Sequence, residues 1–162
     1  MKKIFLLLVL FSLLGCEKDD ICIDDTTPRL VIEFYEKANP TVLRNVTNLK
    51  VTAEGETEFG VFTGTSKISI PLKITDTTTK YSFIINSTDT TFSNEDFIEI
   101  NYTHQNVYVS RACGYKTIFE LDTTSPFVAT DAISNANLWI QDIDIVTTTI
   151  DNENEVHVKI YF

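Results

Sequence analysis

The sequence predicts an all-β protein: a single antiparallel β-sandwich of about eight to nine short strands, immunoglobulin-like in architecture. Three observations support this fold class. Apolar and other residues alternate with period two through most of the chain after residue 29, as they do in strands that bury one face. The segments between these runs are rich in residues that favour turns, mainly Gly, Asn, Asp, Ser and Thr. The sequence has neither an internal repeat nor a second zone of composition, so one domain is expected.

The first half of the domain contains three expected strands and one further candidate. Residues 30–35 and 49–53 alternate apolar with other side chains, and residues 58–63 are a further candidate. In residues 67–74, aliphatic residues alternate with polar ones and with Pro71. Because proline donates no hydrogen bond to a neighbouring strand, Pro71 predicts that this strand lies at the edge of a sheet.

The second half contains six further candidate strands, at residues 81–85, 97–103, 107–112, 116–121, 138–146 and 156–162. His104, Gln105 and Asn106 separate two of them and predict a hairpin turn. Residues 128–137 lack strand character, and a short helical turn is expected there.

The first 15 residues have the layout of a secretory signal peptide. Lys2 and Lys3 precede an apolar run of 11 residues, residues 4–14. This run is far shorter than the ~20 residues of a membrane-spanning helix, so residues 1–15 are expected to direct export and then be removed. Leu13-Leu14-Gly15-Cys16 resembles the lipobox of bacterial lipoproteins. The resemblance implies that Cys16 carries lipid and begins the mature chain; an ordinary secretory signal with an incidental cysteine is the alternative.

The residues after the signal peptide are expected to form a lipidated acidic tether, residues 16–28, ahead of a β-sandwich domain at residues 29–162. The start of this tether resembles the export signal of Bacteroidota lipoproteins, which directs a protein to the outer face of the outer membrane. For this chain the resemblance implies a signal made of Lys18, Asp19 and Asp20. The alternative is a charged tether that merely stays hydrated.

The mature chain would be strongly acidic. Removal of Lys2 and Lys3 leaves 11 basic against 23 acidic residues, a net charge of −12. Nucleic acid is therefore not an expected partner, because phosphate binding requires clustered Lys and Arg. Charge also disfavours adhesion to anionic lipid, so the acyl chains on Cys16 are expected to hold the protein to the membrane.

Cys22 and Cys113 remain once Cys16 carries lipid. Disulfides persist outside the cytosol, and an even remainder of cysteines favours one bridge. Such a bridge would close a loop of about 90 residues and stabilise the fold by roughly 4–5 kcal/mol in the chain-entropy model. The alternatives are two buried free thiols or a reactive Cys113, although neither His104 nor His157 has a context that supplies the base such a thiol needs.

Catalytic motifs are missing from the sequence, which has no G-x-S-x-G, H-E-x-x-H, Walker loop or G-x-G-x-x-G. No enzymatic activity, cofactor or metal site is therefore expected. His157 is expected on the solvent side of the last strand. Asp142 and Asp144 share a strand face but are weak evidence for a glycosidase pair. Residues 151–155 are acidic but lack the glycine and distal glutamate of an EF-hand loop, so a solvated hairpin is favoured over a calcium site.

The triplet Asp-Thr-Thr occurs four times, each time in an expected tether or turn. It resembles the acceptor of Bacteroidota O-glycosylation, which implies candidate sugar sites at Thr26, Thr77, Thr90 and Thr123. The alternative is that Asp and Thr favour turns through local side-chain hydrogen bonds. The sequence supports both interpretations equally.

The lipobox, the acidic tether with Cys22, and residues 109–116 together resemble short Bacteroidota cell-envelope lipoproteins of unknown function. The resemblance supports pairing of Cys22 with Cys113 and an outer-membrane location, with the cell surface slightly favoured over the periplasmic face. It implies no activity. The favoured function is a non-enzymatic module that binds or scaffolds an envelope protein or a glycan, for which an exposed patch using Tyr35, Tyr108 or Trp139 is expected. An accessory lipoprotein of an outer-membrane uptake or assembly complex is the alternative, and a glycan-active enzyme has less support.

Overall fold

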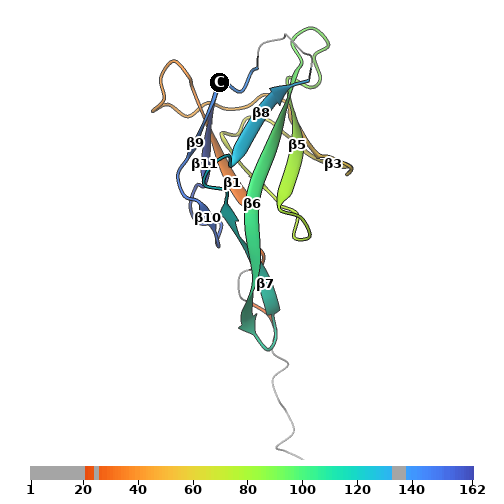
Figure 1. Ribbon diagram of the computed structural model, residues 1–162. Helices are drawn as coiled ribbons and strands as arrows, with labels where there is room; N and C mark the ends of the chain where they lie inside the picture. The colour runs from red at the N-terminus through yellow and green to blue at the C-terminus, as the bar shows by residue number, and fades with distance from the viewer. Residues whose placement is uncertain (1–20, 24–25, 133–137) are drawn as a thin grey trace, which may run out of the picture.

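The computed structural model describes residues 21–23, 26–132 and 138–162. These residues form eleven strands, β1 to β11, and no helix (Figure 1). The prediction of an all-β sandwich is confirmed, with more strands than the eight to nine expected. Among the described residues, nothing is helical, long and apolar enough to cross a membrane.

Four strands form the smaller sheet, in the order β4-β1-β11-β9. Their bounds are Lys67–Ile70 for β4, Leu30–Tyr35 for β1, Val158–Tyr161 for β11 and Asp142–Ile145 for β9. β4 lies at the edge, as Pro71 predicts, although the strand ends directly before the proline. β1 and β11 run parallel, with Ile32 opposite Val158, so the expectation of a wholly antiparallel sandwich is wrong at this pair. Parallel strands need a long connection, and here most of the domain lies between them in sequence.

Seven strands form the larger sheet, in the order β10-β7-β6-β5-β2-β3, with β8 also paired to β6. Their bounds are Leu49–Ala53 for β2, Glu58–Phe62 for β3, Thr78–Ile85 for β5, Asn94–Ser110 for β6, Gly114–Leu121 for β7, Phe127–Asp131 for β8 and Thr149–Ile150 for β10.

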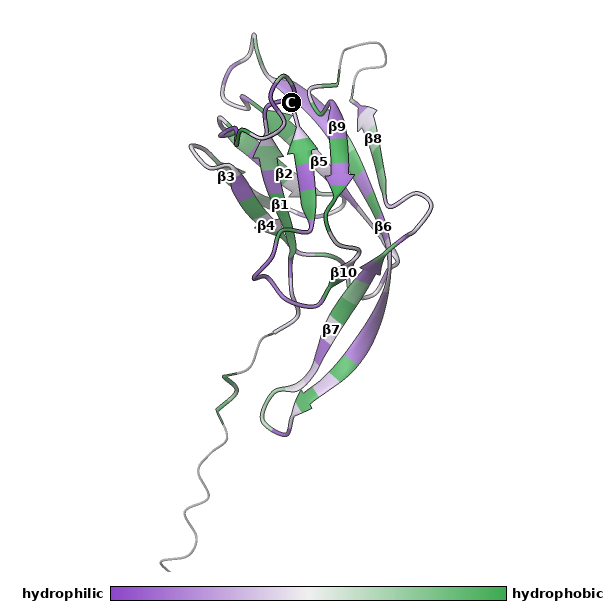
Figure 2. Ribbon diagram, turned by 90° about the vertical axis from the view of Figure 1, so that its left-hand side faces the viewer, coloured by the Kyte–Doolittle hydropathy of each residue, from purple (hydrophilic) through white to green (hydrophobic). Residues whose placement is uncertain are grey.

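The two sheets bury one apolar core between them. Hydrophobic and hydrophilic residues alternate along the strands (Figure 2), and β5 alternates buried with half-buried side chains along its whole length. The core side chains include Leu30, Ile32 and Phe34 from the smaller sheet and Leu49, Val51, Phe83 and Ile98 from the larger one. Each is worth about 1.5–3 kcal/mol of transfer free energy when fully buried.

The long strand β6 is the main departure from the sequence prediction. The hairpin turn expected at His104, Gln105 and Asn106 is wrong, because these residues continue β6 and pair with β7. The far end of the β6–β7 hairpin projects beyond the body of the sandwich (Figure 1). A strand pair in that position has solvent on both faces, so its sequence need not alternate apolar with polar residues.

Two other expectations are corrected by the structure. The helical turn expected in residues 128–137 is wrong over the described part, since β8 pairs with β6 and puts Ala129 opposite Ile98; residues 133–137 lie outside the described residues. His157 is not solvated: it is fully buried. Its Nδ1 accepts a hydrogen bond of 2.9 Å from the backbone N–H of Val31, so it serves as an internal partner for β1.

Candidate functional site

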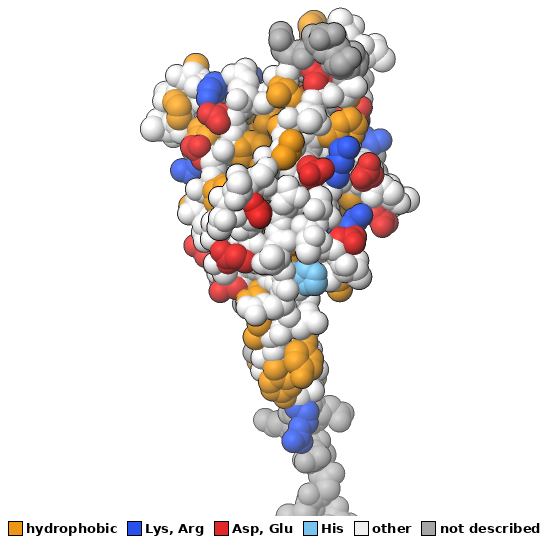
Figure 3. All heavy atoms as spheres, viewed as in Figure 1, with side chains coloured by type: hydrophobic (Ala, Val, Ile, Leu, Met, Phe, Trp, Pro, Cys, Tyr) orange, Lys and Arg blue, Asp and Glu red, His pale blue; other side chains and the backbone are white. Residues whose placement is uncertain are grey.

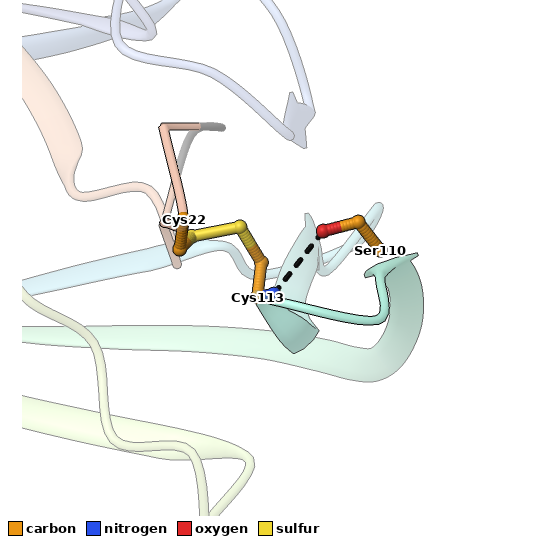
Figure 4. The surroundings of a disulfide bond; sticks show 3 residues. All are labelled: Cys22, Ser110 and Cys113. Atoms are coloured by element: carbon orange, nitrogen blue, oxygen red, sulfur yellow. Dashed lines mark hydrogen bonds between the residues drawn. A yellow bond between two sulfur atoms is a disulfide. The ribbon is translucent and has the colours of Figure 1, made fainter. Parts of the chain in front are cut away.

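A disulfide between Cys22 and Cys113 joins the N-terminal tether to the far end of the β6–β7 hairpin (Figure 4). The Cα atoms of the two cysteines are 4.9 Å apart, and 91 residues separate them in sequence. The predicted bridge is therefore confirmed, and the alternatives of free or reactive thiols are wrong. Cys16, Lys18, Asp19 and Asp20 lie outside the described residues.

The turn of the hairpin is built to present Cys113. The next residue, Gly114, has φ +69°, a left-handed conformation that glycine adopts at little cost. The backbone N–H of Cys113 donates a 3.1 Å hydrogen bond to the Ser110 Oγ atom across the turn (Figure 4). These two features fix where the Cys113 side chain leaves the turn, so that it meets Cys22.

The tether is held to the domain at two further points. The backbone N–H of Thr117 in β7 donates a 3.0 Å hydrogen bond to the Oγ1 atom of Thr27. Arg29 forms a bidentate pair with Glu153: its Nε donates to Oε1 at 2.9 Å and its Nη2 donates to Oε2 at 2.7 Å. The hydrogen bond from Arg29 lowers the pKa of Glu153. The acidic turn 151–155 thus uses this carboxylate to hold the tether, rather than leaving it for an ion.

The end of the hairpin carries exposed aromatic side chains. Tyr108 and Tyr115 are 57% and 70% exposed, and their rings meet edge to face with centroids 5.4 Å apart. Figure 3 shows hydrophobic side chains on this end, followed by basic ones. Of the three aromatics expected on a patch, only Tyr108 is exposed: Tyr35 is half-buried, and Trp139 is buried and donates to the Phe83 carbonyl oxygen.

A pocket of about 450 Å³ lies near the opposite end of β6, where the strand begins. Its lining comes from separate loops and strand ends, and the polar members outnumber the apolar ones. The residues are Arg44, Asn45, Thr47, Ile85, Asn86, Phe92, Asn94, Trp139, Gln141 and Phe162. No motif or period joins them in the sequence, which is why sequence reasoning missed this site.

One wall of this pocket is packed around Phe162. The guanidinium of Arg44 lies over the Phe162 ring, 4.2 Å from its centroid, and its Nη1 donates a 2.5 Å hydrogen bond to the Phe162 carbonyl oxygen. Trp139 meets the same ring edge to face at 5.4 Å. Asn86 has φ +52°, so its backbone takes a turn that asparagine tolerates better than most residues.

The chemistry of the pocket is that of a hydrogen-bonding site whose lining has one cationic side chain, Arg44, and no acidic one. Amide side chains at Asn45, Asn86 and Gln141 supply both donors and acceptors. Arg44 adds donors, and Phe92, 70% exposed, adds an apolar surface beside them. Paired donors and acceptors next to an aromatic ring suit hydroxyl-rich ligands, and the Arg44 guanidinium also suits a ligand that carries an acidic group.

Asp96 and His157 are the ionisable groups that the domain buries most completely, with no exposed surface at Asp96. Burial raises the pKa of Asp96 to about 6, although its Oδ2 accepts a 2.8 Å hydrogen bond from the Ile140 N–H. Asp131 lies opposite Asp96 on β8. Burial lowers the pKa of His157. No ligand can reach Asp96 without opening the core, so we assign it to the fold rather than to a binding site.

The remaining acidic candidates are occupied by neighbours. Lys37 Nζ donates to Asp142 at 2.7 Å, and Tyr161 Oη donates to Asp144 at 3.0 Å, so each carboxylate of this pair is engaged by its own neighbour. Across the described ranges, no group of three or more His, Cys, Asp or Glu residues could hold a metal ion.

The candidate sugar sites are all exposed, at Thr26, Thr77, Thr90 and Thr123. In two of the triplets the aspartate closes the turn: Asp89 Oδ1 accepts from the Thr91 N–H at 2.8 Å, and Asp122 Oδ1 from the Thr124 N–H at 2.8 Å. These hydrogen bonds give the aspartate of each triplet a structural role in its turn, and the middle threonine stays exposed.

A model of a protein family described as a family of unknown function, DUF6452, matches residues 48–162, which includes β2 to β11 and Cys113. No curated protein matches the chain. No solved structure matches it either.

Proposed function

The chain belongs to this family of unknown function, and on that premise we propose that it is a lipid-anchored, non-enzymatic binding module of the cell envelope. In this proposal Cys16 carries the lipid, residues 1–15 are removed, and the domain from residue 29 binds a glycan through the pocket that contains Arg44 and Asn86. The outer membrane of a Bacteroidota-type cell is the proposed location, with Lys18, Asp19 and Asp20 favouring its outer face.

One observation carries the proposal: the tether and the pocket lie at opposite ends of the same strand. The disulfide follows the last residue of β6 by three positions, whereas Asn94, which lines the pocket, begins the strand. A strand of 17 residues is roughly 50 Å long. An anchored domain of this design would present its pocket away from the membrane.

The lipid anchor can be tested by chemistry at Cys16. We expect the full chain to incorporate a labelled fatty acid and to partition into detergent, because two or three acyl chains give stable membrane attachment. Cys16→Ser should abolish the label. Cys22→Ser is the matched control and should keep it, since Cys22 follows the cleavage site. A wild-type chain without label would overturn the anchor.

The orientation of the anchored protein can be tested separately. Protease shaving of intact cells should degrade the wild-type protein and spare a variant with Lys18, Asp19 and Asp20 replaced by alanine. Protection of the wild-type protein would overturn the surface location while leaving the anchor intact.

The pocket can be tested with an array of bacterial envelope oligosaccharides. We expect binding that Asn86→Gly weakens about two- to tenfold, the worth of one hydrogen bond. Glycine keeps the backbone turn at φ +52°. Asn48→Gly is the control, because Asn48 has a similar φ of +45° and does not line the pocket. Equal losses in both variants, or binding that neither affects, would contradict the assignment.

A further inference from the structure

We propose that the end of the β6–β7 hairpin rests in the headgroup layer of the phospholipid bilayer, so that the domain stands on the membrane at a second point beside its lipid. This hairpin tip consists of residues 107–116 together with tether residues 21–23. The inference rests on the proposed lipid at Cys16, and it adds a defined contact surface and a fixed orientation.

Covalent geometry confines the hairpin tip to the neighbourhood of the bilayer. Cys22 lies six residues after Cys16, a distance of at most about 20 Å along a fully extended chain. Cys22 is bonded to Cys113 in the turn of the hairpin. Because acyl chains draw the residue that carries them to the membrane surface, the tip has little freedom to move away from it.

The side chains of the hairpin tip suit that position. Tyr108 and Tyr115 are exposed as an edge-to-face pair, and Ile21 and Ile23 are 79% and 90% exposed. Apolar groups gathered at one end of a domain mark a contact surface. Tyrosine in particular favours the boundary between water and lipid, where the ring is buried and the hydroxyl stays hydrated.

The distribution of charged residues along the hairpin also supports contact with lipid headgroups. Glu99 and Glu120 bracket 20 residues without a single acid, in a chain with 23 of them. That interval contains Arg111 and Lys116, and Arg111 is exposed. Figure 3 shows acidic side chains mixed with basic ones over the body, and basic but no acidic ones at the projecting end. Arginine binds phosphate through paired hydrogen bonds, so Arg111 can hold a lipid headgroup.

The acidic residues of the tether oppose a purely electrostatic contact, since five acids precede residue 26 in the mature chain. The contact we infer is therefore made mainly by the tyrosines and isoleucines, with Arg111 on a single phosphate. Zwitterionic lipid should support it, and anionic lipid should not be required.

The test places a tryptophan at each end of β6 in the full, lipidated chain. Tyr115→Trp reports the hairpin tip. Phe92→Trp is the matched control, because Phe92 has the same 70% exposure as Tyr115 and lines the pocket at the far end. The buried Trp139 is common to both and sets the background. Each protein is reconstituted into phosphatidylcholine vesicles with or without lipid brominated near its headgroup.

We expect the brominated lipid to quench the Tyr115→Trp protein at least twofold more than the Phe92→Trp protein. Iodide added to the water should show the reverse order. Equal quenching of two proteins that both float with the vesicles would overturn the inference and leave the lipid anchor standing. Failure of the wild-type chain to float would overturn the anchor itself. Shielding of Tyr115→Trp from iodide only when other membrane proteins are present would identify a protein partner and also overturn the lipid contact.

Discussion

Asp96 shows how a single buried carboxyl can set the pH dependence of the fold. Its pKa in the folded protein is about 6, above the ordinary value of 3.8 that applies to the unfolded chain. The folded protein therefore binds the proton more tightly, and this group favours folding below about pH 4. That contribution is lost as the pH rises through 6. At neutral pH the buried charge costs the fold up to about 3 kcal/mol.

Asp96→Asn should stabilise the domain at pH 7 by about 1–3 kcal/mol, because the amide keeps an oxygen for the Ile140 N–H and removes the buried charge. Urea unfolding at pH 7 measures the difference, and the advantage should shrink as the pH is lowered toward 4. Glu56→Gln, at an exposed position, is the control and should change little. A destabilised Asp96→Asn protein would show that the charge is compensated.

His157 should act in the opposite direction. Burial lowers its pKa in the folded protein. At a pH below 6.5, the ordinary pKa of histidine, the unfolded chain therefore binds more protons than the folded one, and the free energy of unfolding decreases as the pH is lowered. The slope is at most about 1.4 kcal/mol per pH unit for one proton. His157→Asn keeps an acceptor for the Val31 N–H and removes the titration. Unfolding at pH 7.5 and 5.5 should show the variant gaining on the wild type as the pH falls; a constant difference would contradict this.

A prediction about single residues succeeded where it depended only on the chemistry of the side chains and not on how the strands pack. The bridge between Cys22 and Cys113 follows from counting thiols that are left for an oxidising compartment. His157 was misplaced because alternation in the last strand put it opposite Val158, and the sequence does not reveal that β1 supplies a backbone N–H on that side. The pocket around Arg44 could not be foreseen, since five separate segments build it.

At the scale of elements, the disulfide links two parts that would otherwise be loosely joined. The chain-entropy model gives about 4–5 kcal/mol for a loop of this length. Part of that is lost because residues near Cys22 are exposed and gain freedom in the folded protein when the bridge is absent. Replacement of both Cys22 and Cys113 by alanine should therefore lower the free energy of unfolding by about 2–4 kcal/mol.

Guanidinium unfolding of the double variant, beside the wild type with and without reductant, measures this effect. Reduced wild type should match the variant, and Thr27 should keep the start of the tether against β7 in both. An unchanged wild-type midpoint on reduction would show that the bridge carries no stability.

Elements with one buried face were predictable, and those without one were not. β1, β2 and β5 alternate because they line the core between the sheets. The far half of β6 and most of β8 lack that constraint, so the sequence predicted a turn at residues 104–106, inside β6, and a helical turn at residues 128–137, which overlaps β8. Sheet pairing across a long sequence separation, as between β1 and β11, leaves no local signal either.

For the molecule as a whole, the large negative net charge predicts how binding of the domain to anionic lipid vesicles depends on salt concentration. Residues 17–162, without lipid, carry a net charge of −12. Lowering the salt from about 0.15 M to 0.01 M extends the screening length from ~8 Å to ~30 Å, so the acidic body should be repelled by an anionic surface. Flotation with phosphatidylglycerol vesicles should therefore fall at low salt. Phosphatidylcholine vesicles are the control and should show little change; stronger anionic binding at low salt would mean that Arg111 and Lys116 outweigh the body.

The parallel pairing of β1 with β11 also affects the order in which the two sheets can form during synthesis. β1 is among the first strands to be made and β11 is the last, yet they lie side by side in the middle of the smaller sheet. As the chain emerges from a ribosome, β1 lacks this neighbour until residues 158–161 appear. The smaller sheet therefore cannot be completed before β11 is available, whereas the strands of the larger sheet all lie within residues 49–150 and can pair earlier.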